Sequence, residues 1–114
     1  MAATTFAVPL LPGTTDAWLA GVAEMTGSRR AEFDASLRRL GVTREVVTLQ
    51  RTPDGDVVVV YIEGDDPDSV VARIRVSDDP FDSWFTETML AGTSGLDASQ
   101  ELPPPNQVFI DWTA

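Results

Sequence analysis

The chain has 114 residues and contains no histidine, no cysteine and no lysine, so that all eight of its basic residues are arginine. This composition excludes a histidine-paired nucleophile, a catalytic thiolate, a zinc site of the common nitrogen and sulfur kind and a lysine Schiff base. The formal net charge of −10 argues against nucleic-acid partners and anionic membranes, because basic side chains dominate the affinity for both.

The hydrophobic content of 43% supplies enough apolar material for the core of one domain over residues 1–114. The longest apolar run, Val57 to Ile62, is too short to span a bilayer, and the beginning of the chain lacks the features of a secretory signal. We therefore expect one globular, cytoplasmic domain without a membrane partner.

The first part of the chain predicts a strand followed by a long helix. Thr5 to Leu11 form a short apolar run that ends at Pro12-Gly13. Thr14 or Thr15 caps the helix that follows, and apolar residues recur at three- or four-residue spacing until Gly41 stops it. Gly27-Ser28 interrupts this spacing, which indicates either a kink or a break into two helices.

The middle of the chain predicts a β-hairpin. Val42 to Thr52 are strand-like, Pro53-Asp54-Gly55-Asp56 is a turn of strong hairpin type, and Val57 to Glu63 are rich in β-branched and aromatic residues. Along this last run Val57, Val59 and Tyr61 alternate with Val58, Val60 and Ile62, so that both sides of the strand are apolar.

The last part of the chain predicts two short helices and a closing strand. Asp66-Pro67 and Asp79-Pro80 each supply an N-cap and a first-turn proline, and the second helix ends near Gly92. A loop with three consecutive prolines covers 93–106, and Gln107 to Trp112 form the closing strand.

The resulting order β-α-β-β-α-β predicts an α+β, ferredoxin-like fold with a four-stranded antiparallel sheet and its second helical part split in two. Helices cover one face of such a sheet. Because both sides of Val57–Ile62 are apolar, something also covers the other face, and we expect a second copy of the sheet there. The chain is thus predicted to be a homodimer with a barrel-like centre.

Three segments carry a resemblance to a known family: residues 26–33 (TGSRRAEF), 41–45 (GVTRE) and 79–85 (DPFDSWF). With the predicted order of elements, the chain resembles the dimeric α/β-barrel superfamily, and within it a branch of short bacterial proteins of unassigned activity. The resemblance implies a small-molecule pocket between the sheet and its helices. Catalytic members of the superfamily include cofactor-free monooxygenases, isomerases and cyclases.

Arg29 is the first candidate catalytic residue, because an uninterrupted helix places it in the apolar stripe of Trp18, Met25 and Phe33. A guanidinium in that stripe binds a ligand carboxylate or phenolate, or it pairs with Glu32, Glu63 or Asp111. If the helix breaks at Gly27-Ser28, Arg29 instead turns to the surface.

Tyr61 and Glu63 are the other candidate catalytic residues. The single tyrosine lies on one of two apolar strand faces, where it acts as a general acid or simply packs as a core aromatic. Glu63 would have a raised pKa suited to proton transfer if it were buried, whereas a solvated strand end is the ordinary environment of such a residue.

Aromatic side chains supply the candidate substrate-binding residues. They either stack on a flat ligand or fill the core and the dimer interface, and they are Trp18, Phe33, Trp84, Phe85 and Trp112. Asp79 and Asp82 are explained by helix capping, and the Asp65-Asp66 and Asp78-Asp79 pairs lack the spacing of a calcium loop, so we expect no metal. No phosphate loop or nucleotide fingerprint is present, so we also expect no cofactor.

The leading hypothesis is a cofactor-independent small-molecule enzyme of cyclase, isomerase or monooxygenase type that acts on an aromatic or polyketide-like substrate. Arg29 would stabilise oxyanion charge, and Tyr61 or Glu63 would move a proton. The alternative is a non-catalytic small-molecule-binding domain or a dimeric interaction domain. An enclosed cavity favours the first hypothesis, and a space packed solid with aromatic side chains favours an interaction domain.

Overall fold

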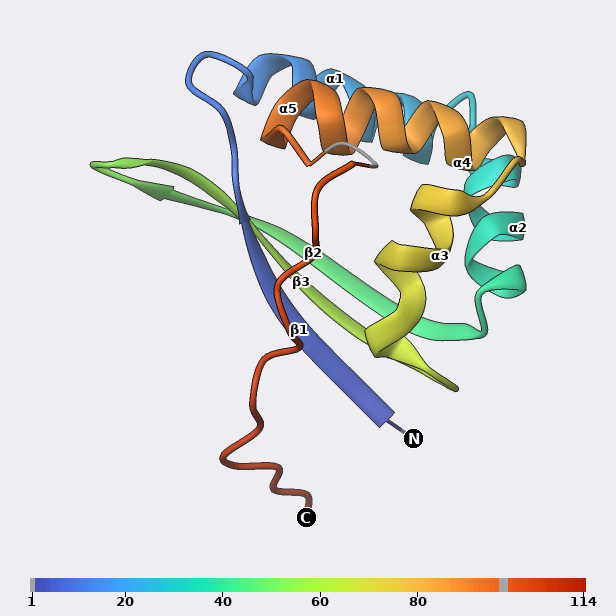
Figure 1. Ribbon diagram of the computed structural model, residues 1–114, viewed down its shortest axis with the longest axis vertical. Coiled ribbons are helices and arrows are strands. Elements are labelled where there is room, and N and C mark those ends of the chain that lie inside the picture. The colour runs from blue at the N-terminus through green and yellow to red at the C-terminus, as the bar shows by residue number, and fades with distance from the viewer. Residues whose placement is uncertain (1, 97–98) are drawn as a thin grey trace.

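The computed structural model describes residues 2–96 and 99–114 and contains one antiparallel sheet with helices on one face (Figure 1). The strands are β1 (Ala2–Pro9), β2 (Val42–Thr52) and β3 (Gly55–Gly64), in the spatial order β1-β3-β2. β2 and β3 form the predicted hairpin, with Thr52 opposite Gly55 across the turn. Gly55 has a φ of 134°, a backbone conformation that favours glycine.

The helical layer begins with the predicted long helix, which is broken in two. α1 (Thr15–Thr26) ends at Gly27, and α2 (Arg30–Arg39) begins three residues later. The glycine and serine between them therefore produce a break, and the apolar spacing of the first helix does not continue in phase into the second.

The second helical part is divided further than predicted. A single turn, η1 (Pro67–Ser69), leads into α3 (Val70–Val76). α4 (Pro80–Phe85) continues through a π-helical turn, η2 (Thr86–Ala91), into the short α5 (Gly92–Ser94). Asp79 caps α4 as expected, because its carboxylate accepts hydrogen bonds from the backbone N–H groups of Phe81 and Asp82.

The two other predicted N-caps are corrected by the structure. Asp66 makes no side-chain cap; instead the Ser69 hydroxyl donates to the Asp66 carbonyl at 2.9 Å. Thr14 stands at the N-cap of α1, but its hydroxyl donates to the carbonyls of Leu11 and Thr93. Thr14 therefore ties the start of α1 to the end of the last helix.

The closing strand is the main difference from the expected fold. Residues 107–112 pair with no strand in the part of the chain that the structure describes, so the sheet has three strands and not four. This segment leads away from the fold beyond β1 as a tail (Figure 1), and its large apolar side chains are exposed: Val108 by 66%, Phe109 by 85%, Ile110 by 86% and Trp112 by 79%. A strand needs a neighbour to satisfy its backbone groups, and the described residues of one copy provide none here.

The core lies between the sheet and the helices. Val58, Val60 and Ile62 of β3 are buried against it, together with side chains from every long helix, among them Trp18, Met25, Leu40, Val70, Ile74, Phe81 and Met89. The opposite face of the sheet, which we call the open face, carries no helix in the part of the chain that the structure describes. Among the described residues no helix is both long and apolar enough to cross a lipid bilayer.

Candidate functional site

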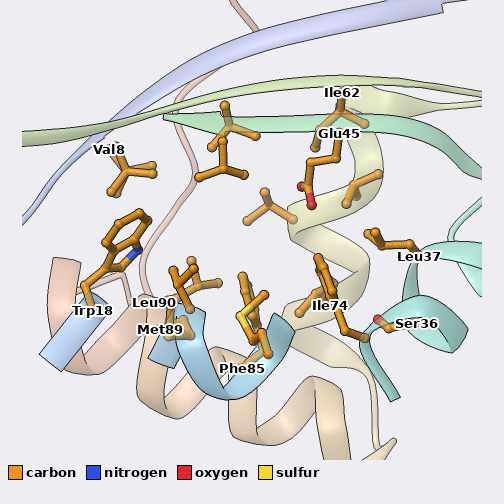
Figure 2. A pocket seen from close by; sticks show the side chains of 18 of the residues that line it. Val8, Trp18, Ser36, Leu37, Glu45, Ile62, Ile74, Phe85, Met89 and Leu90 are labelled. Atoms are coloured by element: carbon orange, nitrogen blue, oxygen red, sulfur yellow. The ribbon is translucent and has the colours of Figure 1, made fainter. Parts of the chain in front are cut away.

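A cavity of about 330 Å³ lies between the helix-facing side of the sheet and the helical layer (Figure 2). Its wall is almost entirely apolar. The sheet contributes Phe6, Val8, Val58, Val60 and Ile62, and the helices contribute Trp18, Val22, Met25, Phe33, Leu37, Val70, Ile74, Phe81, Phe85, Met89 and Leu90. Ligand cavities in proteins commonly measure about 300–1,000 Å³, so this one suits a compact apolar molecule.

The cavity opens toward the outer edge of β2. Val47 lines it and is nevertheless 44% exposed, whereas its partner across the strand pair, Val60, is 7% exposed. A second groove of about 350 Å³ lies between β1 and the proline-rich segment, and it shares Phe6 and Val8 with the cavity wall. The side chain of Asn106 fixes that segment to β1 by donating to the Thr5 carbonyl at 2.7 Å.

Among the described residues, Glu45 is the one charged residue in the cavity wall. It lies on β2 opposite Ile62, which is 1% exposed, and Figure 2 shows its carboxylate directed from the sheet into the cavity. Burial among apolar side chains raises the pKa of Glu45 from 4.5 to about 7, because the charged form loses its hydration there. A carboxyl group with this pKa exchanges a proton readily near neutral pH.

The hydroxyl groups of the cavity wall are engaged in hydrogen bonds within the protein. Thr26 donates to the Val22 carbonyl at 2.9 Å, and Ser94 donates to the Leu90 carbonyl. Ser36 donates to the buried carboxylate of Asp82 at 2.6 Å. These groups are therefore already satisfied before a ligand arrives.

Asp82 organises the helices behind one wall of the cavity. It is 3% exposed and accepts hydrogen bonds from Ser36 of α2, from Ser77 after α3 at 2.7 Å and from Arg39 at 3.4 Å. The same Arg39 guanidinium lies 3.2 Å from Asp79. One carboxylate thus holds α2, the end of α3 and the start of α4 together.

Arg29 is not part of the cavity wall. Because the helix breaks, Arg29 stands at the N-cap of α2, where it forms ion pairs with Glu24 and Glu32. Its guanidinium also stacks over the ring of Trp84, 4.5 Å from the ring centroid. The hydrogen bond to Glu24 is the main reason that the pKa of Arg29 is raised.

Tyr61 and Glu63 lie on the open face, opposite to the cavity, because they alternate with the buried Val60 and Ile62. The guanidinium of Arg44 lies 6.0 Å from the Tyr61 ring centroid and 3.8 Å from the Glu63 carboxylate. Desolvation and the Glu63 carboxylate raise the pKa of Tyr61. The structure therefore corrects the expected convergence of Arg29, Tyr61 and Glu63 in one pocket.

The candidate aromatic residues divide into two groups. Trp18, Phe33 and Phe85 line the cavity. Trp84 instead packs beneath Arg29 and against Phe81, with 5.6 Å between ring centroids, and Trp112 lies in the exposed tail. Across the described ranges, no three acidic side chains are close enough to hold a metal ion together.

Glu45 is the functional candidate that the sequence analysis missed. Arg44-Glu45 at the start of a strand has the appearance of a solvated pair, and Glu63 seemed the better carboxylate. The available signal was the spacing of Glu45, Val47 and Leu49, which places the carboxylate on the same side of β2 as two apolar residues.

The chain was compared with known proteins. No protein-family model matches the sequence, and no curated protein matches it. Among solved structures, the fold is similar to that of tetracenomycin F2 cyclase from Streptomyces glaucescens, a type-II polyketide cyclase. The TM-score is 0.57 with 22% sequence identity, over 100% of this chain and 99% of the cyclase. The likeness at this identity establishes a shared α+β fold.

Proposed function

We propose that this protein is a cofactor-independent small-molecule enzyme of the cyclase or isomerase type, acting on an aromatic or polyketide-like molecule held in the cavity. The observation that carries the proposal is the apolar cavity of about 330 Å³ with a carboxylate directed into it. The resemblance to a polyketide cyclase of nearly equal length supports the same class of substrate. The sequence-based hypothesis also included a monooxygenase. Oxygenation is less well supported than cyclisation or isomerisation, because the carboxylate in the cavity wall favours proton transfer.

The unfilled space argues against a domain that serves only for interaction. Such a domain would pack Trp18, Phe33 and Phe85 against one another and leave no room between them. Here the three side chains instead form parts of the wall of one cavity. Binding without turnover, as in a ligand carrier, is the competing function that experiments must separate from catalysis.

Binding is tested with 1,8-dihydroxyanthraquinone, a neutral aromatic molecule of polyketide type. In a variant with Trp84→Phe and Trp112→Phe, Trp18 becomes the single tryptophan, and we expect the bound quinone to quench its fluorescence. Val60→Phe fills the cavity from the central strand and should weaken binding at least tenfold. Equal quenching of the filled and unfilled proteins would contradict the proposal.

We also propose that the working unit is a homodimer in which a second copy covers the open face. Val46 is 38% exposed on this face beside the half-buried Val59 and Tyr61, and the exposed apolar tail of 108–112 belongs to the same chain. Exposed apolar side chains gathered on one chain are typical of an interface. We expect a dimer at micromolar concentration in sedimentation equilibrium; a monomer would refute this part of the proposal.

A further inference from the structure

The cavity wall leaves two polar groups without a partner inside the protein. One is the Glu45 carboxylate, for which the described part of the chain provides neither a hydrogen bond nor an ion pair. The other is the indole N–H of Trp18, a residue 8% exposed, which likewise has no acceptor among the described residues. Both groups are accessible from the cavity, since neither is a fully buried polar atom, so each is available to form a hydrogen bond to a ligand.

The two groups occupy different ends of the cavity. Trp18 comes from α1 and lies near Val8 of β1, whereas Glu45 comes from β2 on the other side of the central strand (Figure 2). The indole nitrogen lies on the edge of the ring that is turned toward the cavity. A single ligand that spans the cavity would therefore meet a hydrogen-bond donor at one end and a carboxyl group at the other.

The charges around Glu45 do not supply a counter-ion. Within residues 2–96 and 99–114, no other residue of the cavity wall is charged. Behind the wall, Arg39 of α2 is paired with Asp79 and Asp82 at the start of α4. Arg73 of α3 donates to the Leu40 carbonyl at 2.7 Å. An anionic ligand would thus find no cation in the cavity and would be repelled by ionised Glu45, so the cavity selects uncharged molecules.

We propose that the substrate is an uncharged compound with two or more carbonyl groups: one carbonyl oxygen accepts a hydrogen bond from the Trp18 indole at one end of the cavity, and Glu45 at the other end transfers a proton at a carbon next to a different carbonyl group. This inference rests on the proposed function, since it assigns the chemistry of the same cavity. Glu45 is then the catalytic residue, and Trp18 binds and orients the substrate.

Glu45 and the substrate together account for every proton that the reaction moves. The Glu45 carboxylate removes the proton from a carbon next to a carbonyl group, and the electron pair of the broken C–H bond forms an enolate. In an isomerisation, protonated Glu45 returns the proton to the enolate oxygen or to another carbon. In a cyclisation, the enolate carbon first bonds to a second carbonyl carbon of the same molecule, whose oxygen takes the proton from Glu45. Neither path needs a further reactant, and Glu45 ends as it began.

The assignment of Glu45 can be tested without the natural substrate. 5-Nitrobenzisoxazole is a neutral, flat molecule from which a base removes a carbon-bound proton; the N–O bond breaks, a nitrile forms and the electron pair remains on the phenolate oxygen. We expect the native protein to accelerate this elimination, with a rate that rises with pH and reaches half its maximum near pH 7, the pKa of Glu45. Glu45→Gln should lower the rate on the order of 100-fold.

Three further variants make the result specific. Glu87→Gln changes an exposed glutamate outside the cavity in the same way and should leave the rate unchanged. Glu45→Asp keeps the charge, withdraws the carboxylate by one methylene and should retain a reduced, pH-dependent rate. Trp18→Phe removes the fluorescent reporter, so its binding of 1,8-dihydroxyanthraquinone is followed by the absorbance of the quinone; it should be weakened about three- to tenfold, the effect of one lost hydrogen bond.

The outcomes separate this inference from the proposed function. If the anthraquinone binds native protein and Glu45→Gln equally and both catalyse the elimination at the same rate, Glu45 is not the base, and the proposed function survives. If neither probe binds the native protein, the proposed function fails and the inference fails with it. A native rate without pH dependence around 7 would also overturn the assignment of Glu45.

Discussion

The two faces of the sheet carry similar side chains in very different surroundings. On the helix-facing side Glu45 lies among valines, leucine and isoleucine, and burial alone raises its pKa to about 7. On the open face Glu63 lies beside Arg44 and Tyr61, with an ion pair at 3.8 Å. The comparison shows that the sheet face decides whether a glutamate is a candidate base. A glutamate on the helix-facing side is desolvated and has a raised pKa, whereas one on the open face forms an ion pair.

The largest effect is expected from Asp82, which supports the helix-facing side. Asp82→Ala leaves the hydroxyls of Ser36 and Ser77 and the guanidinium of Arg39 without their buried acceptor. We expect the free energy of unfolding to fall by about 3 kcal/mol in urea titrations. Asp78→Ala, at an exposed neighbouring position, should change it by less than about 0.5 kcal/mol. Equal effects of the two variants would contradict the organising role of Asp82.

The second effect is a pH dependence of stability caused by Glu45. Its pKa is raised in the folded protein, so the folded chain keeps a proton that the unfolded chain loses between pH 4.5 and about 7. The contribution to stability is complete below pH 4.5 and is lost as the pH rises through 7. Glu45→Gln removes this loss, and relative to the native protein it should gain up to about 3 kcal/mol by pH 8.5 compared with pH 4. Parallel urea midpoints of the two proteins across this range would refute the burial of the carboxylate.

A smaller effect is expected from the matching substitution on the open face. Glu63→Gln breaks a solvent-accessible ion pair with Arg44, and such pairs contribute between about 0 and 1 kcal/mol. The variant should therefore unfold within about 1 kcal/mol of the native protein. The difference between the Glu45→Gln and Glu63→Gln pH profiles measures the difference between the two faces directly.

The smallest effect on the fold is expected from the exposed tail. Phe109→Ser combined with Ile110→Ser removes two side chains that are 85% and 86% exposed in a single chain. The stability of the monomer should change by less than about 0.5 kcal/mol, while self-association, followed by sedimentation, should weaken at least tenfold. A large loss of monomer stability would show that the tail packs on its own chain.

The elements that local sequence signals determine were predicted well. The hairpin follows from Pro53-Asp54-Gly55-Asp56 between two β-branched runs, and Gly27-Ser28 gave the position of the helix interruption, though not whether it is a kink or a break. The closing strand was predicted wrongly. The apolar pattern of Gln107–Trp112 indicates that these residues favour burial, but it does not indicate which strand they would pair with.

The candidate site was predicted only in part, for a related reason. Trp18, Phe33 and Phe85 could be identified because large aromatic side chains on amphipathic helices face the sheet. The environment of Arg29 depended on the helix break, which the sequence left open between two readings. The facing of Glu45 and Glu63 depended on the register between two strands, which individual residues do not reveal.

The irregularity at the start of β2 gives the fold a property that a regular strand would lack. Val42 pairs with Gly64 and Arg44 pairs with Glu63, so that Thr43 is an extra residue in the ladder. Val42 packs on the core and Glu45 lines the cavity, although residues three apart in a regular strand point to opposite sides. Thr43 is what allows both. If Thr43 were deleted, Val42 and Glu45 would point to opposite sides of β2. Either Val42 would leave the core or Glu45 would leave the cavity, and no substitution elsewhere in β2 would restore both positions.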